Sequence, residues 1–254
     1  MNARNIESFY PLSPMQQGML FHSRLAPQSG VYVEQVQCTL RGDLQVAAFE
    51  QAWQDVMARH AILRTSFVGE KLKEPVQIVH RDLEVPLEIL DWRHLSRDEQ
   101  QSRLEARAAS ERAQGFDLTQ APLLRLALVR TTDETHEFLW TYHHILLDGW
   151  SQPLLYQEVF SLYEAHIRGE ELALAPSRAY RDYIVWLKRQ DMAAAETFWR
   201  NTLEGFDTPT PLATARPLNA VEDQPECYAE AEINVPAETT AALQAFARQH
   251  GFTL

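Results

Sequence analysis

The chain has 254 residues and a formal net charge of −12, from 23 basic and 35 acidic side chains. This balance argues against nucleic acid as the principal partner, because phosphate binding requires clustered Lys and Arg. Hydrophobic residues make up 45% of the sequence and charged residues 23%, as in a globular protein and not a disordered one. At about 150 residues per domain, the length corresponds to roughly one and a half domains.

The sequence shows neither a targeting signal nor a cysteine pattern typical of a disulfide or metal site. No apolar stretch approaches the roughly 20 residues that a membrane-spanning helix needs, and the first residues lack the pattern of a signal peptide. The two cysteines, Cys38 and Cys227, are far apart and outside any CxxC spacing. This usage fits a reducing compartment and excludes a cysteine-based zinc site. We therefore expect a cytoplasmic protein.

Strand and helix patterns alternate in the first part of the chain, which indicates an α/β fold. Residues 31–40 alternate in polarity and predict a strand. Residues 44–60 place apolar side chains on one stripe and predict a helix, with Asp43 as its N-cap. Short strands are expected at 62–68 and 76–80.

The middle of the chain continues this alternation. Ser96 and Glu99 match a capping box and predict a helix that ends at about Gly115. Residues 123–130 and 136–145 predict two strands joined by a polar turn, as in a hairpin. Further helices are expected at 153–168 and, as an aromatic-rich pair that packs against the core, within 178–203.

A proline-rich segment marks a domain boundary. Residues 205–227 contain four prolines among polar residues, a composition typical of a linker. Residues 228–235 then predict a strand and 237–250 a helix. We therefore expect a complete lobe over 1–204, a linker over 205–227, and the first strand and helix of a second lobe over 228–254.

The residues suited to chemistry concentrate where the strand of 136–145 gives way to a loop, a common place for functional groups. Because side chains alternate along a strand, His143 and His144 point to opposite sides, and one substrate can meet only one of them. Asp148 needs a partner in this apolar stretch, and we expect Arg64 to supply it. Gly149 permits close approach of the backbone to a ligand.

Other interpretations of this cluster are weaker or simpler. Taken alone, a pair of histidines on a strand is more often structural than functional. His144 and Asp148 would be metal ligands if they lay on a helix, but the strand pattern before them argues against it, and we expect no metal. A serine hydrolase would need a G-x-S-x-G turn, and a nucleotide site a glycine-rich loop, and the sequence has neither.

Four segments together resemble the condensation domains of nonribosomal peptide synthetases. Residues 143–149 (HHILLDG) match the family's HHxxxDG motif. In the same order as in the family, 10–22 resembles the opening motif, 59–67 the RHxxLRTxF motif and 180–186 the YxDYxxW motif. The C-terminal end, 228–254, resembles the start of the family's second lobe.

The resemblance implies a chloramphenicol acetyltransferase-like lobe, a sheet flanked by helices that forms half of a V-shaped pseudodimer. It implies amide formation, in which a carrier-bound aminoacyl amine attacks an upstream carrier-bound thioester. The substrates would arrive on 4'-phosphopantetheine arms, with no cofactor bound directly. The implied partners are donor and acceptor peptidyl carrier proteins and an adjacent adenylation domain. One lobe alone would be inactive.

The resemblance also implies roles for the residues of the loop. His144 would be the catalytic residue, which accepts a proton from the amine, or orients the amine and stabilises the tetrahedral intermediate. Asp148 would pair with Arg64 and hold the loop. The residues expected to support the active-site loop are His143, Asp148, Gly149, Trp150 and Arg64.

The subtype and the alternatives complete the prediction. The SPMQQGMLFH and HHILLDGWS segments resemble domains that accept a D-configured donor from an upstream epimerisation domain, and a dual epimerisation/condensation domain is the main competitor. Two other functions stay open: a stand-alone acyl-CoA-dependent acyltransferase of the chloramphenicol acetyltransferase type, and a non-catalytic lobe that docks a carrier protein. Because carrier proteins are also acidic, docking would use local basic or apolar patches.

Overall fold

The computed structural model describes residues 5–27, 29–69, 72–208 and 233–254. The chain forms two compact units, Met1–Glu204 and Gly205–Leu254. In the second unit the predicted helix is confirmed as α7, Ala237–His250, which ends at Gly251 in the left-handed conformation. The predicted linker and the strand before α7 fall mostly outside the described residues.

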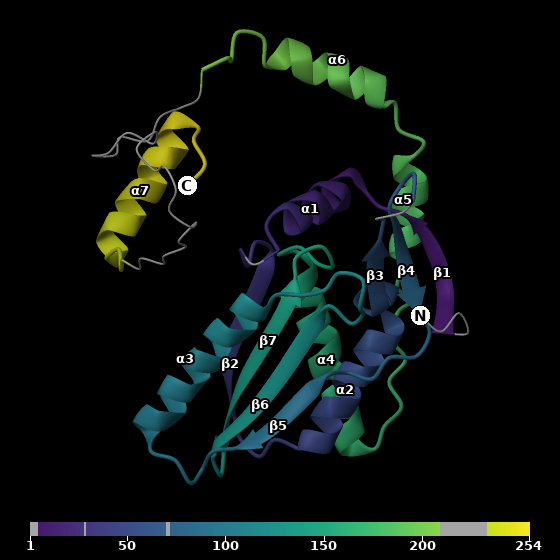
Figure 1. Cartoon of the computed structure of the whole chain (residues 1–254). Coiled ribbons are helices and arrows are strands. Elements are labelled where there is room, and N and C mark those ends of the chain that lie inside the picture. Colours follow the sequence, from purple (N-terminus) through teal and green to yellow (C-terminus); the bar gives the residue numbers. More distant parts are fainter. Residues whose placement is uncertain (1–4, 28, 70–71, 209–232) are drawn as a thin grey trace. The chain divides into compact units, whose positions relative to one another are not determined.

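A four-stranded sheet lies at the centre of the first unit (Figure 1). Its strands, in spatial order, are β2 (Val33–Arg41), β7 (Thr135–His143), β6 (Leu124–Thr132) and β5 (Leu87–Asp91). Strands β6 and β7 pair antiparallel, which confirms the predicted hairpin, and β5 runs parallel to β6. Strand β2 pairs antiparallel with β7 from end to end. Strand β7, which ends at the first histidine of the HHxxxDG motif, is therefore held on both sides.

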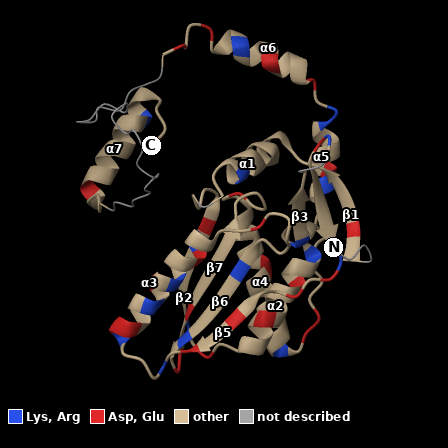
Figure 2. Ribbon diagram, in the orientation of Figure 1, with Lys and Arg blue, Asp and Glu red and all other residues tan. Residues whose placement is uncertain are grey.

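Helices cover both faces of this sheet (Figure 1). Helices α2 (Val46–Arg59) and α4 (Ser151–Arg168) lie on one face, and α3 (Arg97–Gln114) lies on the other. Helix α3 turns Ala108 toward Leu139 of the sheet, and it carries charges of both signs along its length (Figure 2). The two central strands, β6 and β7, are thus buried on both faces along most of their length, whereas the edge strands β2 and β5 stay partly exposed.

Aromatic side chains fill the core between the sheet and helices α2 and α4. The rings of Phe49 and Phe138 meet edge to face at 5.3 Å, and those of Trp53 and Trp140 at 5.2 Å. All four side chains are fully buried. Such pairs contribute about 0.5–1.5 kcal/mol each beyond the burial of their area.

Two predictions about helix starts had different outcomes. The capping box of α3 is confirmed, because the Ser96 N–H donates to Glu99 Oε2 at 3.0 Å and the helix ends at Gly115. The N-cap role predicted for Asp43 is wrong: Gln45 occupies that position and makes no side-chain cap. The Asp43 carboxylate lies two residues too early and accepts from the Gln45 amide instead.

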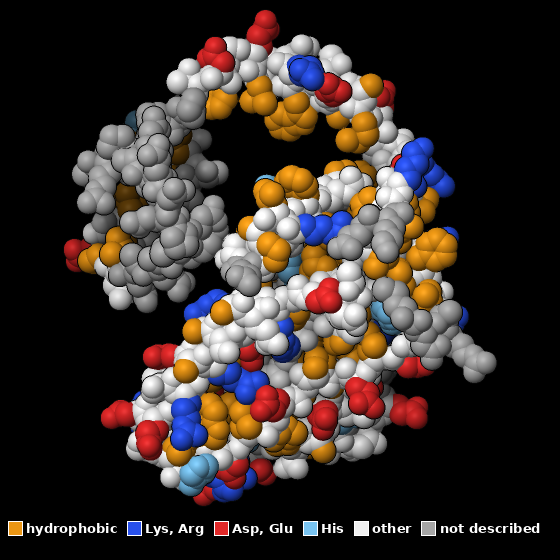
Figure 3. Space-filling model, in the orientation of Figure 1, with side chains coloured by type: hydrophobic (Ala, Val, Ile, Leu, Met, Phe, Trp, Pro, Cys, Tyr) orange, Lys and Arg blue, Asp and Glu red, His pale blue; other side chains and the backbone are white. Residues whose placement is uncertain are grey.

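A second, three-stranded antiparallel sheet has the order β1 (Ile6–Pro11), β4 (Val76–His80), β3 (Thr65–Val68). The strand predicted at 62–68 begins later, because Ala61–Arg64 form a 3-10 turn. Helix α1 (Pro14–Leu25) follows β1. Figure 3 shows hydrophobic side chains gathered over α1, where Met15, Phe21 and Leu25 are exposed.

The aromatic helix pair forms as α5 (Tyr180–Leu187) and α6 (Met192–Thr202). In α5, Ile184 is buried against Tyr10 and Val79. Helix α6 buries none of its side chains in the described part of the chain. The prediction that both helices pack against the core is therefore correct only for α5. Among the described residues, no helix has the length and apolar character to cross a membrane.

Candidate active site

The backbone on either side of the two histidines is fixed by neighbouring segments. The His143 N–H donates to the Leu123 carbonyl at 3.0 Å, which continues the pairing of β7 with the β6 side of the sheet. The His144 N–H donates to the Tyr32 carbonyl at 2.8 Å, just before β2. The loop therefore leaves the sheet at a defined point between its two neighbours.

His143 is buried, with 2% of its surface exposed, and both ring nitrogens are engaged. Its Nδ1 accepts from the Ile145 N–H at 3.1 Å, so Nε2 carries the proton and donates to the Ser23 hydroxyl at 3.1 Å. Burial, with a smaller contribution from His144, lowers the pKa of His143 to about 4. His143 is thus neutral and has no free nitrogen for a substrate.

His144 is held by one nitrogen only. Its Nδ1 lies 2.6 Å from the Leu147 carbonyl oxygen. A carbonyl oxygen can only accept, so Nδ1 carries a proton, and in the neutral ring Nε2 keeps its lone pair. In their neutral forms the two adjacent histidines therefore have opposite tautomers, and His144 offers Nε2 as a proton acceptor.

Each histidine lines a different cavity. His144 lines a cavity of ≈ 780 Å³ and His143 one of ≈ 340 Å³. Helix α1 borders both, with Met19 in the first and Ser23 in the second. The prediction that the two side chains serve different sides of the strand agrees with this arrangement.

The four motifs singled out in the sequence meet around the cavity of His144. The opening motif contributes Met15 and Met19, the RHxxLRTxF motif His60, and the YxDYxxW motif Tyr183. Segments that lie far apart in the chain are thus brought to one apolar chamber beside a basic imidazole, which is the usual composition of a ligand pocket.

The predicted ion pair between Arg64 and Asp148 is wrong. Arg64 is buried and donates to the carbonyls of Met57, at 3.0 Å, and Ala58, at 3.1 Å, and to Glu7, at 2.8 Å. These acceptors satisfy the guanidinium at the end of α2 and at β1. Arg64 therefore ties helix α2 to the small sheet and does not reach the loop.

Asp148 lies in the loop before α4, ahead of the N-cap Trp150, and is exposed. Its carboxylate accepts from the Ser151 hydroxyl at 2.6 Å and from the Ser151 N–H at 2.9 Å. The Ser151 hydroxyl bond is the main reason that the pKa of Asp148 is lowered. A carboxylate at this end of a helix also interacts favourably with the helix dipole. Asp148 thus secures the exit of the loop into α4.

The last two predicted loop residues make few contacts. A Cβ at Gly149 would meet no atom within 4 Å, so nothing in the described structure demands a glycine there. Trp150 is 87% exposed. Both residues are exposed to solvent.

Sequence reasoning missed a group of buried polar residues beside the loop. Tyr180 donates to the Ser13 hydroxyl at 3.3 Å, and burial raises the pKa of Tyr180. Gln16 and Gln77 are buried and bonded to each other. The spacing of Ser13 and Gln16 is that of a capping box, the same signal that identified the start of α3.

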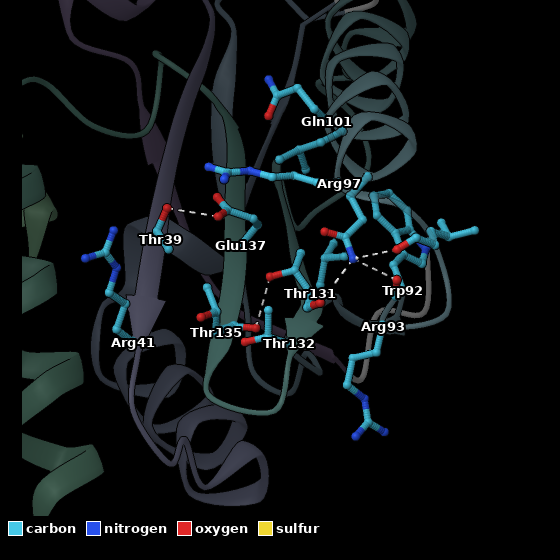
Figure 4. A pocket seen from close by; sticks show the side chains of 14 residues that line it. Thr39, Arg41, Trp92, Arg93, Arg97, Gln101, Thr131, Thr132, Thr135 and Glu137 are labelled. Atoms are coloured by element: carbon cyan, nitrogen blue, oxygen red, sulfur yellow. Dashed lines mark hydrogen bonds between the residues drawn. The ribbon is translucent and has the colours of Figure 1, made fainter.

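Another cavity, of ≈ 590 Å³, lies at the far end of β7 from the histidines, where Thr135 and Glu137 line it (Figure 4). The Glu137 carboxylate accepts from Thr39, and Arg93 is neutralised by Asp91 and Asp133. This cavity offers no paired acid and base for chemistry. In the described part of the chain, no cluster of three or more His, Cys, Asp or Glu could hold a metal ion.

Comparison with known sequences identifies the family. The sequence model of the family described as "Condensation domain" matches residues 6–254. The chain belongs to the condensation-domain family. The membership predicted from the four motifs is thus confirmed.

Relatives of this condensation-domain chain are much longer proteins. One protein of the linear gramicidin synthase of Brevibacillus parabrevis is 50% identical over 98% of this chain, which spans 5% of that protein. Bacitracin synthase 1 of Bacillus licheniformis is 34% identical over 100% of this chain, which again spans 5% of the relative. The chain thus corresponds to a small part of each of these synthetases.

Solved structures support the fold. The starter condensation domain of rhizomide synthetase RzmA has a TM-score of 0.68 at 22% identity, over 81% of this chain and 51% of that one. A four-domain nonribosomal peptide synthetase bound to AMP and glycine has a TM-score of 0.55 at 23% identity, over 62% of this chain and 12% of that one. The predicted chloramphenicol acetyltransferase-like α/β fold is confirmed.

Proposed function

We propose that this chain supplies the histidine-bearing part of a condensation domain that forms amide bonds in a nonribosomal peptide synthetase. The observation that carries the proposal is the tautomer of His144. Its Nδ1 is bonded to the Leu147 carbonyl at 2.6 Å, which leaves Nε2 as a proton acceptor beside the larger cavity.

In the proposed reaction, the α-amine of the acceptor attacks the carbonyl carbon of the donor thioester. The C–N bond forms and the C–S bond breaks, and the proton lost by the amine passes through His144 Nε2 to the leaving thiolate. His143 cannot replace His144, because both of its ring nitrogens are already bonded. Holding two tethered reactants together lowers the entropic part of the barrier, so the walls of the cavities contribute as well.

The two cavities support delivery of the two substrates from different sides of the loop. We propose that each substrate is carried on a 4'-phosphopantetheine arm by a peptidyl carrier protein, with an adenylation domain adjacent in a cytoplasmic synthetase. Carrier proteins are acidic and this chain has a net charge of −12, so the two would not attract one another overall. Local basic or apolar contacts would therefore dock the carriers. The exposed side chains of Met15, Phe21 and Leu25 on α1 form one such apolar surface.

A second lobe completes the proposed domain. Residues 228–254 resemble its beginning, and the rhizomide structure has about twice the length that this chain matches. A chain that carries one lobe would be inactive by itself, because the second lobe would supply the opposite wall of the cavity of His144. Gly149 and Trp150, which are exposed in the loop, would face the incoming thioester.

We also propose that the donor is D-configured and comes from an upstream epimerisation domain. The support is the form of the two segments SPMQQGMLFH and HHILLDGWS, of which Met15, Met19 and Ser151 line the cavity of His144. A condensation assay with matched D and L donors on the same carrier tests this, and equal rates for both would contradict it.

The catalytic proposal is tested in the complete domain with loaded donor and acceptor carrier proteins. We expect His144→Ala to abolish amide formation while both carriers still load. His94→Ala, which alters an exposed histidine before α3, is the matched control and should condense at the wild-type rate. Full activity of His144→Ala would refute the role of His144 as the proton acceptor.

A further inference from the structure

A buried network of amides lies directly beneath the active-site loop. Gln16, on the first turn of α1, is 3% exposed, and Gln77, on β4, has no exposed surface. Gln77 Nε2 donates to Gln16 Oε1 at 3.0 Å and to the Pro11 carbonyl at 3.0 Å. Gln16 Oε1 also accepts from the Ser13 N–H at 3.0 Å. These bonds fix which end of the Gln16 amide is oxygen and which is nitrogen.

The nitrogen end of Gln16 points to the loop. Gln16 Nε2 donates to the Ile145 carbonyl at 3.4 Å and to Gln77 Oε1 at the same distance. The Ile145 N–H donates to His143 Nδ1 at 3.1 Å. Ile145, the residue that follows His144, is therefore held by side chains through both its N–H and its carbonyl.

We propose that Gln16 is a positioning residue that sets the place of His144 through the Ile145 carbonyl. The inference rests on the proposed catalytic role of His144. The oxygen of Gln16 belongs to the helix cap and its nitrogen to the loop, so a single amide joins the start of α1 to the HHxxxDG segment. A loss of the nitrogen end leaves the cap intact and releases the Ile145 carbonyl.

The capping box of α3 can be compared with that of α1, to separate the role of Gln16 in capping from its role in holding the loop. At the start of α3, Glu99 accepts from the Ser96 N–H at 3.0 Å, the same distance as in the cap of α1. A carboxylate therefore serves the capping box as well as an amide does. Capping alone does not require the donor that Gln16 carries. The donor is required by the Ile145 carbonyl and by Gln77.

The test is Gln16→Glu in the complete condensation domain, with Glu99→Gln as the reciprocal control at the other capping box. Rates are measured with loaded carriers and expressed per folded protein, with kcat and KM determined separately. We expect Gln16→Glu to lower kcat by about 10²-fold, the effect of displacing a catalytic group by about 1 Å, with KM for both carriers unchanged. Glu99→Gln should leave kcat and KM at wild-type values.

Gln16→Met removes the donor together with the cap acceptor and buries no charge, and it replaces Gln16→Glu if that variant does not fold. A folded Gln16 variant with wild-type kcat would overturn the proposal, whatever its melting temperature. A raised KM with unchanged kcat would also overturn it, because it would indicate a contact with substrate. A wild-type domain that forms no amide would refute the proposed function instead, so the two failures are distinguishable.

Discussion

Because His143 is buried and neutral, we expect it to change the free energy of unfolding by a calculable amount as the pH falls. Its pKa is lowered from the ordinary 6.5 to about 4, because burial disfavours the charged ring. The folded state therefore resists protonation that the unfolded chain accepts freely. The contribution of His143 to stability is fully present above pH 6.5, is lost as the pH falls toward 4, and does not change further below that.

The size of the effect follows from these two pKa values. Between pH 8 and pH 5 the linkage amounts to about 2 kcal/mol of unfolding free energy. His143→Asn removes the titration but keeps an oxygen near the position of Nδ1, where it can still accept from the Ile145 N–H. We expect this variant to be less stable at pH 8 because it fills less volume. Its stability should fall less steeply on acidification.

Urea denaturation of the complete domain, followed by tryptophan fluorescence at pH 8 and pH 5, measures the difference. The loss of unfolding free energy between the two pH values should be about 2 kcal/mol greater in the wild type than in His143→Asn. Other titrating groups are common to both proteins and cancel. Parallel pH dependences would show that His143 is not held neutral by burial.

Two further variants test the corrected roles of Asp148 and Arg64. Asp148→Ala should remain folded and lose about 1 kcal/mol in thermal unfolding, the usual cost of a lost hydrogen bond, because the Asp148 carboxylate bonds only to Ser151, the first residue of α4; an unfolded product would point to a buried ion pair. Arg64→Lys should lose about 3 kcal/mol in the same measurement, since one ammonium cannot satisfy the several acceptors that the buried guanidinium holds; wild-type stability would contradict this.

The order of elements was largely predictable, because it depends on local patterns. The hairpin of β6 and β7 and the capping box at Ser96 have signals within a few residues of themselves. The N-cap of α2 was misplaced because Asp43 has the right residue type two positions too early. The exposure of α6 was not predictable, because its apolar stripe looks the same whether or not another surface covers it.

The sequence predicts which residues form the candidate site, but it does not predict their hydrogen-bond partners. The alternation of His143 and His144 follows from strand geometry, which is local. The partner of Asp148 was inferred from charge alone, and Arg64 found closer acceptors in the carbonyls at the end of α2, which no sequence pattern reveals. Gln16 was missed because its role depends on contacts with residues 61 and 129 positions away in the chain.

The pairing of β7 with both of its neighbours fixes its register, and the register determines which histidine faces which cavity. Side chains alternate along a strand, so a slip of one position against β2 would move every side chain to the other face. His143 and His144 would then exchange cavities. The register of β7, a strand of nine residues, thus decides which of the two adjacent histidines faces the cavity where the chemistry is proposed. An insertion of one residue in β7 would therefore move Phe138 and Trp140 off the core face together with the histidines, so the register that holds the core also selects the imidazole.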